Sequence, residues 1–329
     1  MDKVRWGILS TAKIGVEKVI PAMQHCKYAE VKAIASRTLT SAQSAAAELR
    51  IEQAYASYDE LLADPSIQAI YNPLPNHMHV PWTIKAIEAG KHVLCEKPIA
   101  LSVEEANTLQ ESLARHPGVK VMEAFMYRFH PQWQRALELV RSGALGDIQT
   151  IQTFFSFFND DPNNIRHSPE MGGGGVMDIG CYPISLSRYI YEREPLRLLA
   201  TLNIDPEFGV DRSASAIMDF GGPTSTFTCS MEMSPFQRTQ IVGNKGRIEL
   251  EIPFNAPPQN PTRIWVSNEQ GTVTESFSAC DQYTEQGDVF SQAIINDEPV
   301  PTPLSDAISN MQVIEAVFES DKSGGWVAL

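Results

Sequence analysis

Short apolar runs alternate with amphipathic segments over the first third of the chain. Apolar runs bounded by turn residues predict strands at 4–9, 29–37, 67–72, 91–96 and 119–125. The segments between them predict helices at 13–25, 40–49, 58–63, 79–90 and 102–118, the last with Ser102 as N-cap and Glu105 completing a capping box. Strands that alternate with helices are typical of a parallel sheet with right-handed crossovers.

After about residue 124 the pattern changes. Residues 130–143 predict one more helix, and 147–158 alternate apolar and polar like a long antiparallel strand. Further strands are predicted at 214–220, 225–233, 239–252, 262–268 and 272–278, with a hairpin turn at Gly243-Asn244, and a final helix covers 304–320. We therefore expect two domains: a doubly wound parallel α/β domain at 1–123, and an α+β domain with a mostly antiparallel sheet at 124–329.

The composition narrows the class of protein. Hydrophobic residues form 43% of the 329 residues, which fits a soluble globular chain with a substantial core. The net charge of −14 argues against binding to nucleic acid or to an anionic membrane. The five cysteines are widely spaced without a C-x-x-C pair, and there is neither a signal peptide nor an apolar run that could span a bilayer. These features favour a cytoplasmic protein with reduced thiols.

The turn after the first strand resembles a dinucleotide-binding loop. Such a loop needs a tight turn, a close approach of backbone to pyrophosphate and a helix N-terminus that favours an anion. The segment from 10 to 15 has a single glycine, Gly15, but its small residues keep the loop narrow. The residues that would contact the cofactor here are Ser10, Thr11, Ala12 and Ile14. By itself the segment fits an ordinary strand-turn-helix connection equally well.

The end of the second strand bears on the choice of cofactor. NAD-specific sites usually hold the ribose hydroxyls with an acid at this point. Here the residues are Ser36 and Arg37, a hydroxyl followed by a cation that suits a ribose 2′-phosphate. NADP is therefore the expected cofactor and NAD the second choice, although a lone arginine such as Arg37 is also common as a solvated surface residue.

Two later strand ends carry further polar motifs. "PNHMH" follows the strand at 67–72, and "EKP" follows the strand at 91–96. Open α/β sheets bind ligands at the carboxyl ends of their strands. Pro98 restricts Lys97 to extended geometry, so we expect Lys97 to point off the strand end. A surface Glu-Lys pair before a turn is the alternative.

The segment "GGGGVMDIGCYPIS" begins with glycines at 172–175 and continues into a predicted helix near Val176. The glycines would permit a close approach of backbone to cofactor or substrate. Asp178 and Tyr182 are four residues apart and share one helix face, while Pro183 is expected to kink the helix. Alternatively, Asp178 is an acid in the first helical turn and Tyr182 a buried aromatic.

Four motifs occur in the order opening loop, "PNHMH", "EKP" and "GGGGVMDIGCYPIS". With them, the chain resembles the Gfo/Idh/MocA oxidoreductases over residues 4 to about 190. The resemblance implies a Rossmann domain followed by an α/β domain with a large open sheet, which in many members forms an oligomer interface. It therefore implies a homodimer or homotetramer. It also implies cofactor contacts at Leu74, Asn76, His79, Glu96 and Lys97. Ser10 and Ala12, in place of glycines, depart from the family pattern and put the cofactor affinity in question.

The spacing D-x-x-x-Y is similar to the branch with glucose–fructose oxidoreductase, dihydrodiol dehydrogenases and NADP-dependent xylose dehydrogenases. The resemblance assigns the acid/base role to Tyr182, with Asp178 orienting Lys97 or a substrate hydroxyl. Free tyrosine titrates near pH 10, and the Lys97 ammonium would lower that value. The expected activity is hydride transfer between NADP and a sugar or related polyol. An NAD-dependent glycoside hydrolase and a non-catalytic redox sensor are the alternatives.

Two further segments could line the substrate pocket. Residues 123–131 offer Phe125, Met126 and Arg128, and residues 160–170 offer Asn164, Arg166 and His167. Among these, Phe125 and Arg166 are the preferred substrate contacts, with Tyr182. Arg166 could equally hold its loop through a carboxylate. His77 and His79 stand two apart without a nearby third ligand, so no metal site is predicted.

Overall fold

A computed structural model describes residues 3–329, and these form two compact units. The first unit holds the described residues up to Met126 together with Gln282–Ile308, and the second holds Tyr127–Asp281 and Ser309–Leu329. The segment 282–308 therefore packs with the first unit, whereas the predicted division at 123/124 placed it in the second domain. The α/β class predicted from the alternation of strands and helices is confirmed.

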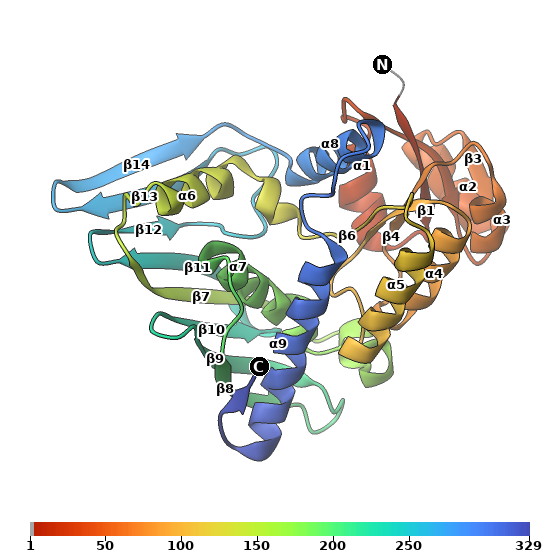
Figure 1. Ribbon diagram of the computed structural model, residues 1–329. Coiled ribbons are helices and arrows are strands. Elements are labelled where there is room, and N and C mark those ends of the chain that lie inside the picture. The colour runs from red at the N-terminus through yellow and green to blue at the C-terminus, as the bar shows by residue number, and fades with distance from the viewer. Residues whose placement is uncertain (1–2) are drawn as a thin grey trace. The chain divides into compact units, whose positions relative to one another are not determined.

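The first unit is built on a six-stranded sheet in the order β3-β2-β1-β4-β5-β6, and every pair in it is parallel (Figure 1). Its strands are β1 Val4–Leu9, β2 Ala29–Ala35, β3 Gln53–Tyr55, β4 Ala69–Asn72, β5 His92–Cys95 and β6 Val121–Glu123. The chain order reverses between β1 and β4, as it does in doubly wound dinucleotide-binding sheets. The sequence predicted all these strands except the short β3.

The first unit also holds helices, one of which begins with the cap that the sequence predicts. They are α1 Ile20–Met23, α2 Leu39–Leu49, α3 Tyr58–Ala63, α4 His79–Glu88 and α5 Val103–Arg115. The Ser102 hydroxyl accepts from the Glu105 N–H at 3.1 Å, as the predicted capping box requires. The sequence did not predict α8, Gln282–Ile295, whose Phe290 packs against Trp6 of β1 with ring centroids 5.6 Å apart.

The second unit is built on a nine-stranded sheet in the order β14-β13-β12-β11-β7-β10-β9-β8-β15. Its strands are β7 Ile148–Phe158, β8 Arg197–Ile204, β9 Asp211–Asp219, β10 Thr224–Ser230, β11 Glu232–Gly243, β12 Gly246–Leu250, β13 Thr262–Asn268, β14 Gly271–Phe277 and β15 Val327–Ala328. The predicted hairpin turn lies between β11 and β12. The strand predicted at 147–158 is antiparallel to β11 and parallel to β10, and the other pairs of this sheet are antiparallel, which confirms a mostly antiparallel sheet.

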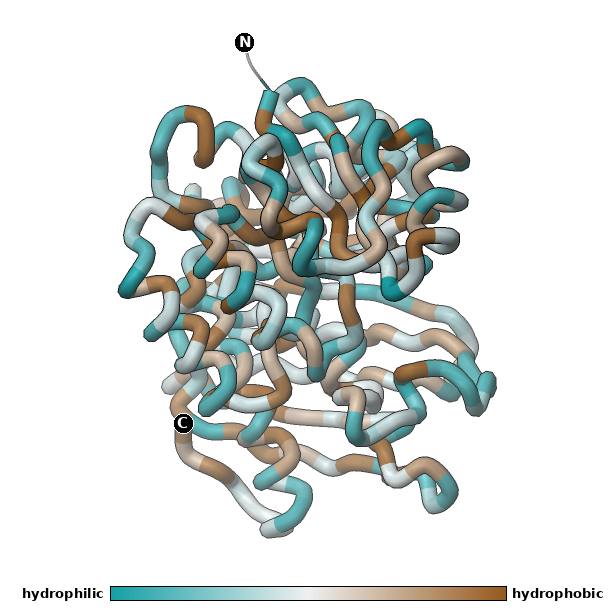
Figure 2. Tube along the Cα trace, turned by 90° about the vertical axis from the view of Figure 1, so that its right-hand side faces the viewer, coloured by the Kyte–Doolittle hydropathy of each residue, from teal (hydrophilic) through white to brown (hydrophobic). Residues whose placement is uncertain are grey.

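Helices cover one face of this sheet. α6 Pro131–Arg141 and α7 Cys181–Tyr191 lie against it in Figure 1, and α9 is Leu304–Ser323. Ile151 and Phe155 of β7 are buried, whereas Gln152 between them is exposed, which gives the alternation expected of a half-buried strand. Figure 2 colours the Cα trace by hydropathy, and short brown apolar stretches alternate along it with teal hydrophilic ones.

Pro183, which the sequence predicts to kink its helix, and Pro21 each follow a π-helical turn. Pro21 comes after Gly15–Val19, and Pro183 comes after Val176–Gly180. A proline ring in a regular α-helix clashes with the carbonyl four residues earlier, which here belongs to Glu17 or Ile179. Both carbonyls lie within the wider π turns, so the helix continues past each proline.

Candidate active site

In the first unit, four neighbouring strands bring the predicted cofactor residues to one edge of the sheet. β2, β1, β4 and β5 are adjacent and parallel, so their carboxyl ends lie side by side. The candidates follow directly on these strands: Ser36 and Arg37 after β2, Ser10, Thr11, Ala12 and Ile14 after β1, Leu74 and Asn76 after β4, and Glu96 and Lys97 after β5. Segments up to 87 residues apart in the sequence thus meet at one ligand-binding edge.

The loop after β1 keeps the conformation of a glycine-containing fingerprint without its first glycines. Ser10 adopts φ +72°, the left-handed region that usually favours glycine. Its hydroxyl accepts from the Ala12 N–H at 3.2 Å, so the side chain stabilises the turn itself. Gly15 packs close to Pro73 and Tyr71, where an added Cβ would lie 3.6 and 3.7 Å away. The loop therefore fits a dinucleotide despite its departure from the family pattern.

The edge after β2 carries hydroxyls beside the predicted cation. Ser36 is buried, while Arg37 is exposed and available to a ligand. Thr38 caps α2, its hydroxyl accepting from the Ser41 N–H at 3.2 Å. Thr40, Ser41 and Ser44 of α2 line a small cavity with Thr11 of the opening loop. The sequence analysis missed this row of hydroxyls, which the composition "TLTSAQS" could have indicated as partners for a phosphate or ribose.

His79 joins two of the loops at this edge. It is fully buried, and its Nδ1 and Nε2 each lie 2.7 Å from a backbone carbonyl, of Pro98 and Leu74 respectively. Burial lowers the pKa of His79 to about 4, so the ring is neutral and its tautomer decides which carbonyl accepts the N–H. The side chain therefore ties the "PNHMH" loop to the "EKP" loop, which a sequence motif alone does not reveal.

The "EKP" segment places a carboxylate and an ammonium after β5. The Tyr71 hydroxyl donates to Glu96 Oε1 at 2.7 Å, and the Lys97 N–H donates to Glu96 Oε2 at 3.3 Å. Burial, reinforced by Glu96, raises the pKa of Tyr71 well above its usual value, so Tyr71 remains a neutral donor. Lys97 is half-buried, and its peptide bond to Pro98 is cis.

In the second unit, Tyr182 lies on α7 in an aromatic setting. Its ring centroid is 5.1 Å from Phe254, 5.7 Å from Phe155 and 5.9 Å from Tyr127, and the residue is 5% exposed. These rings fix the plane of the tyrosine. The structure thus gives Tyr182 the buried aromatic surroundings that the sequence analysis named as the alternative.

Asp178, one turn earlier, forms an ion pair with Arg166. Arg166 Nε lies 2.7 Å from Asp178 Oδ2, and the negative charge of Asp178 holds the pKa of the guanidinium above its usual value. The structure thus displays the alternative in which Arg166 holds its loop through a carboxylate. Asn164 supports the same loop, its side-chain oxygen accepting from the Arg166 N–H at 3.1 Å.

The glycine segment packs against protein groups. A Cβ on Gly173 would lie 2.4 Å from the Arg166 carbonyl oxygen, and one on Gly174 would lie 2.1 Å from Asp211 Oδ1. Gly175 comes next, with Asp211 Oδ2 at 3.2 Å from its ideal Cβ. The expectation that these glycines make room for cofactor or substrate is therefore corrected for 173–175, whose neighbours are Arg166 and Asp211.

The remaining substrate candidates are mostly buried. Phe125 and Met126 are each 2% exposed. Arg128 is 4% exposed, and its Nη2 donates to the Ser185 hydroxyl at 2.8 Å. His167 packs on Phe208 with centroids 4.6 Å apart. These contacts give Arg128 and His167 structural partners inside the second unit.

Among residues 3–329 there is neither a clustered metal-ligand set nor a helix suited to a membrane. Within this range, no group of three or more His, Cys, Asp or Glu is arranged to hold a metal ion. Nor does any helix in the same residues combine the length and apolar character that crossing a bilayer requires.

Two family models match the two halves of the chain. One, described as an oxidoreductase family with an NAD-binding Rossmann fold, matches residues 4–125, and the other, described as the GFO/IDH/MocA C-terminal domain, matches 133–249. The chain belongs to the Gfo/Idh/MocA oxidoreductase family. It is therefore an enzyme of the nicotinamide-dependent oxidoreductase type, and the family resemblance of its motifs is confirmed.

Relatives within the Gfo/Idh/MocA family match over nearly the whole chain. An uncharacterised oxidoreductase of Rhizobium meliloti is 43% identical, covering 99% of both chains. The D-xylose 1-dehydrogenase (NADP(+)) 2 of Haloferax volcanii is 38% identical, covering 98% of this chain and 99% of the relative. A 3-ketoreductase from Actinomadura kijaniata, solved with NADP and TDP-benzene, superposes with a TM-score of 0.90 at 27% identity, covering 97% and 98%.

The contacts of the glycines predict that replacing glycine by alanine destabilises the fold more at Gly174 than at Gly222. Gly174→Ala should lower the free energy of unfolding by about 1–3 kcal/mol more than Gly222→Ala, because only the former overlaps the Asp211 carboxylate. Both glycines have positive φ, at +106° and +129°, and an added Cβ on Gly222 would meet no atom within 4 Å. Urea denaturation of both variants measures the difference, and equal losses would contradict the packing account.

Proposed function

We propose that this chain is an NADP-dependent dehydrogenase or reductase that acts on a sugar or related polyol. The observation that carries the proposal is the meeting, at one edge of a parallel sheet, of the Ser10 turn, Arg37 and Lys97. The name of the Haloferax relative, which specifies D-xylose and NADP(+), supports the same substrate class and cofactor. The characterised relatives named above are a dehydrogenase and a reductase, which favours turnover over the redox-sensor and hydrolase alternatives.

The cofactor would be held by the edge described above. The backbone of 10–12 and the hydroxyls of α2 suit its phosphates and ribose, and Arg37 suits a 2′-phosphate. The bound nicotinamide would supply the exchange of hydride with the substrate carbon. Leu74, Asn76 and Glu96 would contribute to the cofactor pocket, and His79 would act by holding the loops that present them.

We assign the proton transfer to Tyr182. Its phenolate oxygen would take the proton of the substrate hydroxyl in oxidation, and the resulting tyrosine hydroxyl would return that proton in reduction. Lys97 would supply positive charge that favours the phenolate. Asp178 would keep Arg166 in place, and Arg166 would then offer its remaining N–H groups to substrate hydroxyls.

Loss of either proposed catalytic group should abolish turnover while the cofactor still binds. We expect Lys97→Met and Tyr182→Phe each to lower kcat by at least about 100-fold, because general acid/base groups contribute that much or more. Steady-state nicotinamide absorbance measures the rate, and titration of tryptophan fluorescence measures NADPH binding. Tyr191→Phe is the control on the same helix, since its hydroxyl bonds the Thr224 carbonyl. Rates like those of the unaltered enzyme in either variant would remove that residue from the mechanism.

Arg37 should discriminate between the two cofactors. Arg37→Ala should weaken NADPH binding by about 10- to 100-fold and leave NADH unchanged, because a charge-assisted bond contributes roughly 1.5–3 kcal/mol. Dissociation constants for both cofactors provide the measurement. Arg115→Ala, at an exposed position of α5, serves as the control. An equal loss for both cofactors would show that Arg37 does not bind the 2′-phosphate.

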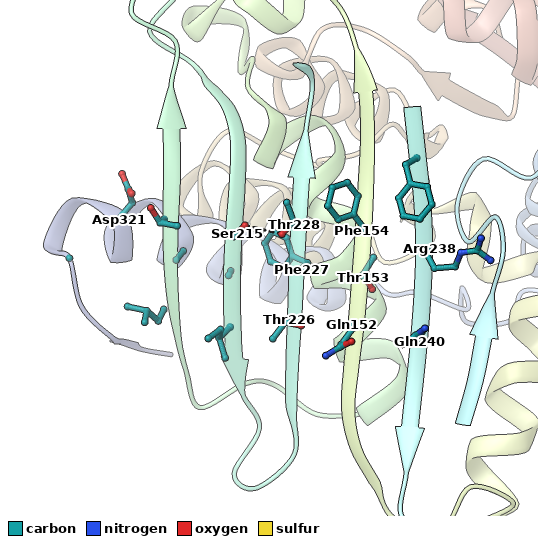
Figure 3. A pocket seen from close by; sticks show the side chains of 17 residues that line it. Gln152, Thr153, Phe154, Ser215, Thr226, Phe227, Thr228, Arg238, Gln240 and Asp321 are labelled. Atoms are coloured by element: carbon teal, nitrogen blue, oxygen red, sulfur yellow. Dashed lines mark hydrogen bonds between the residues drawn. The ribbon is translucent and has the colours of Figure 1, made fainter. Parts of the chain in front are cut away.

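We also propose that the open face of the nine-stranded sheet joins two copies of the chain, in a homodimer or homotetramer of a cytoplasmic enzyme. This face carries a groove of about 810 Å³. Phe154, Thr226, Thr228 and Arg238 lie along it on adjacent strands (Figure 3). Ile217 and Phe236 also line it and are 41% and 49% exposed, which is unusual for large apolar side chains.

A charge placed on this face should separate the copies. We expect Ile217→Asp to lower the mass measured by light scattering to that of one chain, since it buries an unpaired carboxylate in the contact. Val273→Asp, at a 63% exposed position on β14 outside the groove, should leave the assembly intact. An Ile217→Asp variant with unchanged mass would refute the assignment of this face.

A further inference from the structure

The helix that bears Asp178 and Tyr182 begins without a cap from its own sequence. Its N-cap residue is Gly175, which has no side chain to accept the first N–H groups. A helix start leaves such donors without intrahelical partners. In this structure the Val176 N–H donates instead to Asp211 Oδ2 at 2.7 Å, from a strand 35 residues further along the chain. Asp211 is only 3% exposed.

The glycine loop is shaped to admit this carboxylate. Asp211 Oδ1 occupies space that a Cβ on Gly174 would enter, and Gly174 has the positive φ of +106°. The next residue, Gly175, also lies against Asp211, and a Cβ there would be 3.2 Å from Oδ2. Two adjacent glycines therefore let an acceptor oxygen from another element reach a helix start, where backbone N–H groups lack intrahelical partners.

The capped loop in turn holds the residues proposed for the chemistry. The Gly174 carbonyl accepts from the Asp178 N–H at 3.0 Å. Tyr182 follows one turn later on the same continuous helix. Whatever fixes the backbone of 174–176 therefore fixes the start of the helix that presents both side chains.

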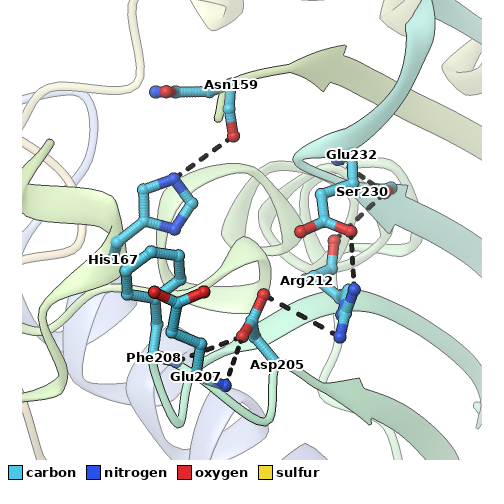
Figure 4. Close-up of polar contacts among 8 residues, drawn as sticks. All are labelled: Asn159, His167, Asp205, Glu207, Phe208, Arg212, Ser230 and Glu232. Atoms are coloured by element: carbon cyan, nitrogen blue, oxygen red, sulfur yellow. Dashed lines mark hydrogen bonds and ion pairs between the residues drawn. The ribbon is translucent and has the colours of Figure 1, made fainter. Parts of the chain in front are cut away.

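Asp211 is the first residue of β9. The neighbouring Arg212 places Nη1 3.1 Å from Glu232 Oε2 and Nη2 3.8 Å from Asp205 Oδ2, and the Ser230 hydroxyl donates to the Arg212 carbonyl at 3.0 Å (Figure 4). Residues at three other positions in the sequence, Asp205, Ser230 and Glu232, therefore contact the start of β9 through Arg212. The backbone that carries the Asp211 carboxylate is thus held in place at the adjacent residue, Arg212.

The same polar cluster reaches the loop of Arg166. Asp205 accepts from the Phe208 N–H at 3.1 Å, and the Phe208 ring packs on His167, the residue after Arg166 (Figure 4). His167 Nε2 lies 3.2 Å from the Asn159 carbonyl oxygen. One cluster therefore braces both groups that contact the Asp178 helix, namely the Arg166 guanidinium and the Asp211 carboxylate.

We propose that Asp211 is a positioning residue: by capping the helix start at Val176 from β9, it holds Asp178 and Tyr182 in the geometry that proton transfer requires. The catalytic consequence rests on the proposed function, whereas the capping itself does not. Capping needs an acceptor oxygen and not a full charge. Burial, opposed by the N–H donors and reinforced by Asp178, raises the pKa of Asp211 to about 7, so an uncharged oxygen suits this position.

The test compares Asp211→Ala with Asp211→Asn. Asp211→Ala should lower kcat by about 100-fold while NADPH binding stays unchanged, because a small displacement of a reacting group costs about that much. Asp211→Asn should recover most of kcat, since Asn and Asp rank alike as N-caps. Asp219→Ala is the matched control at the other end of β9, where the carboxylate pairs with Arg197 at 2.9 Å.

Amide hydrogen exchange over 174–182 gives a second readout that does not depend on turnover. Exchange should accelerate by about 2- to 30-fold in Asp211→Ala, as expected from losing a cap, and remain slow in Asp211→Asn and Asp219→Ala. Unchanged exchange in Asp211→Ala would overturn the capping. Accelerated exchange with unchanged kcat would overturn the positioning role. If the unaltered enzyme turns over no sugar, the proposed function fails and the exchange result still decides the capping.

Discussion

Parallel strand pairing is the constraint on which the first unit depends. Because every strand of its sheet runs in the same direction, the connections that follow β2, β1, β4 and β5 emerge at one edge. Ser10, Arg37, Asn76 and Lys97 come from four separate segments, yet each lies within four residues of the end of its strand. The sheet thereby brings together residues that individually would not indicate a binding site. His79 connects two of the loops at this edge through its contacts with the Pro98 and Leu74 carbonyls.

A different constraint operates in the second unit, where a helix start must satisfy its N–H groups. The chain meets it with a remote acceptor, Asp211, and keeps side chains off Gly174 and Gly175 to admit it. The ion pair between Arg166 and Asp178 then joins the preceding loop to the same helix. The two units therefore contribute in different ways, one by collecting strand ends and the other by bracing one helix.

The alternation of strands and helices and the helix cap at Ser102 could be predicted from the sequence, because both depend on residues that are close together in the chain. The helix at 282–295 could not, since Gly287 weakens its propensity and its stability comes from distant contacts. A Cβ on Gly287 would lie 2.9 Å from Cys26 Sγ, and Asp288 accepts from the N–H groups of Lys27 and Tyr28. The glycines at 173–175 were likewise predicted to make room for a cofactor or substrate. Their actual neighbours include Asp211, which lies more than 30 residues away in the sequence and could not be inferred from it.

The most direct test of the proposed activity is nicotinamide absorbance during incubation of the purified enzyme with NADP, and then NAD, against aldoses, inositols and dihydrodiols. The account predicts reduction of NADP with at least one of these classes of hydroxyl compound, and slower or no reduction of NAD. NADPH binding, seen by quenching of tryptophan fluorescence, without turnover of any class in either direction would contradict it and favour a cofactor-binding sensor.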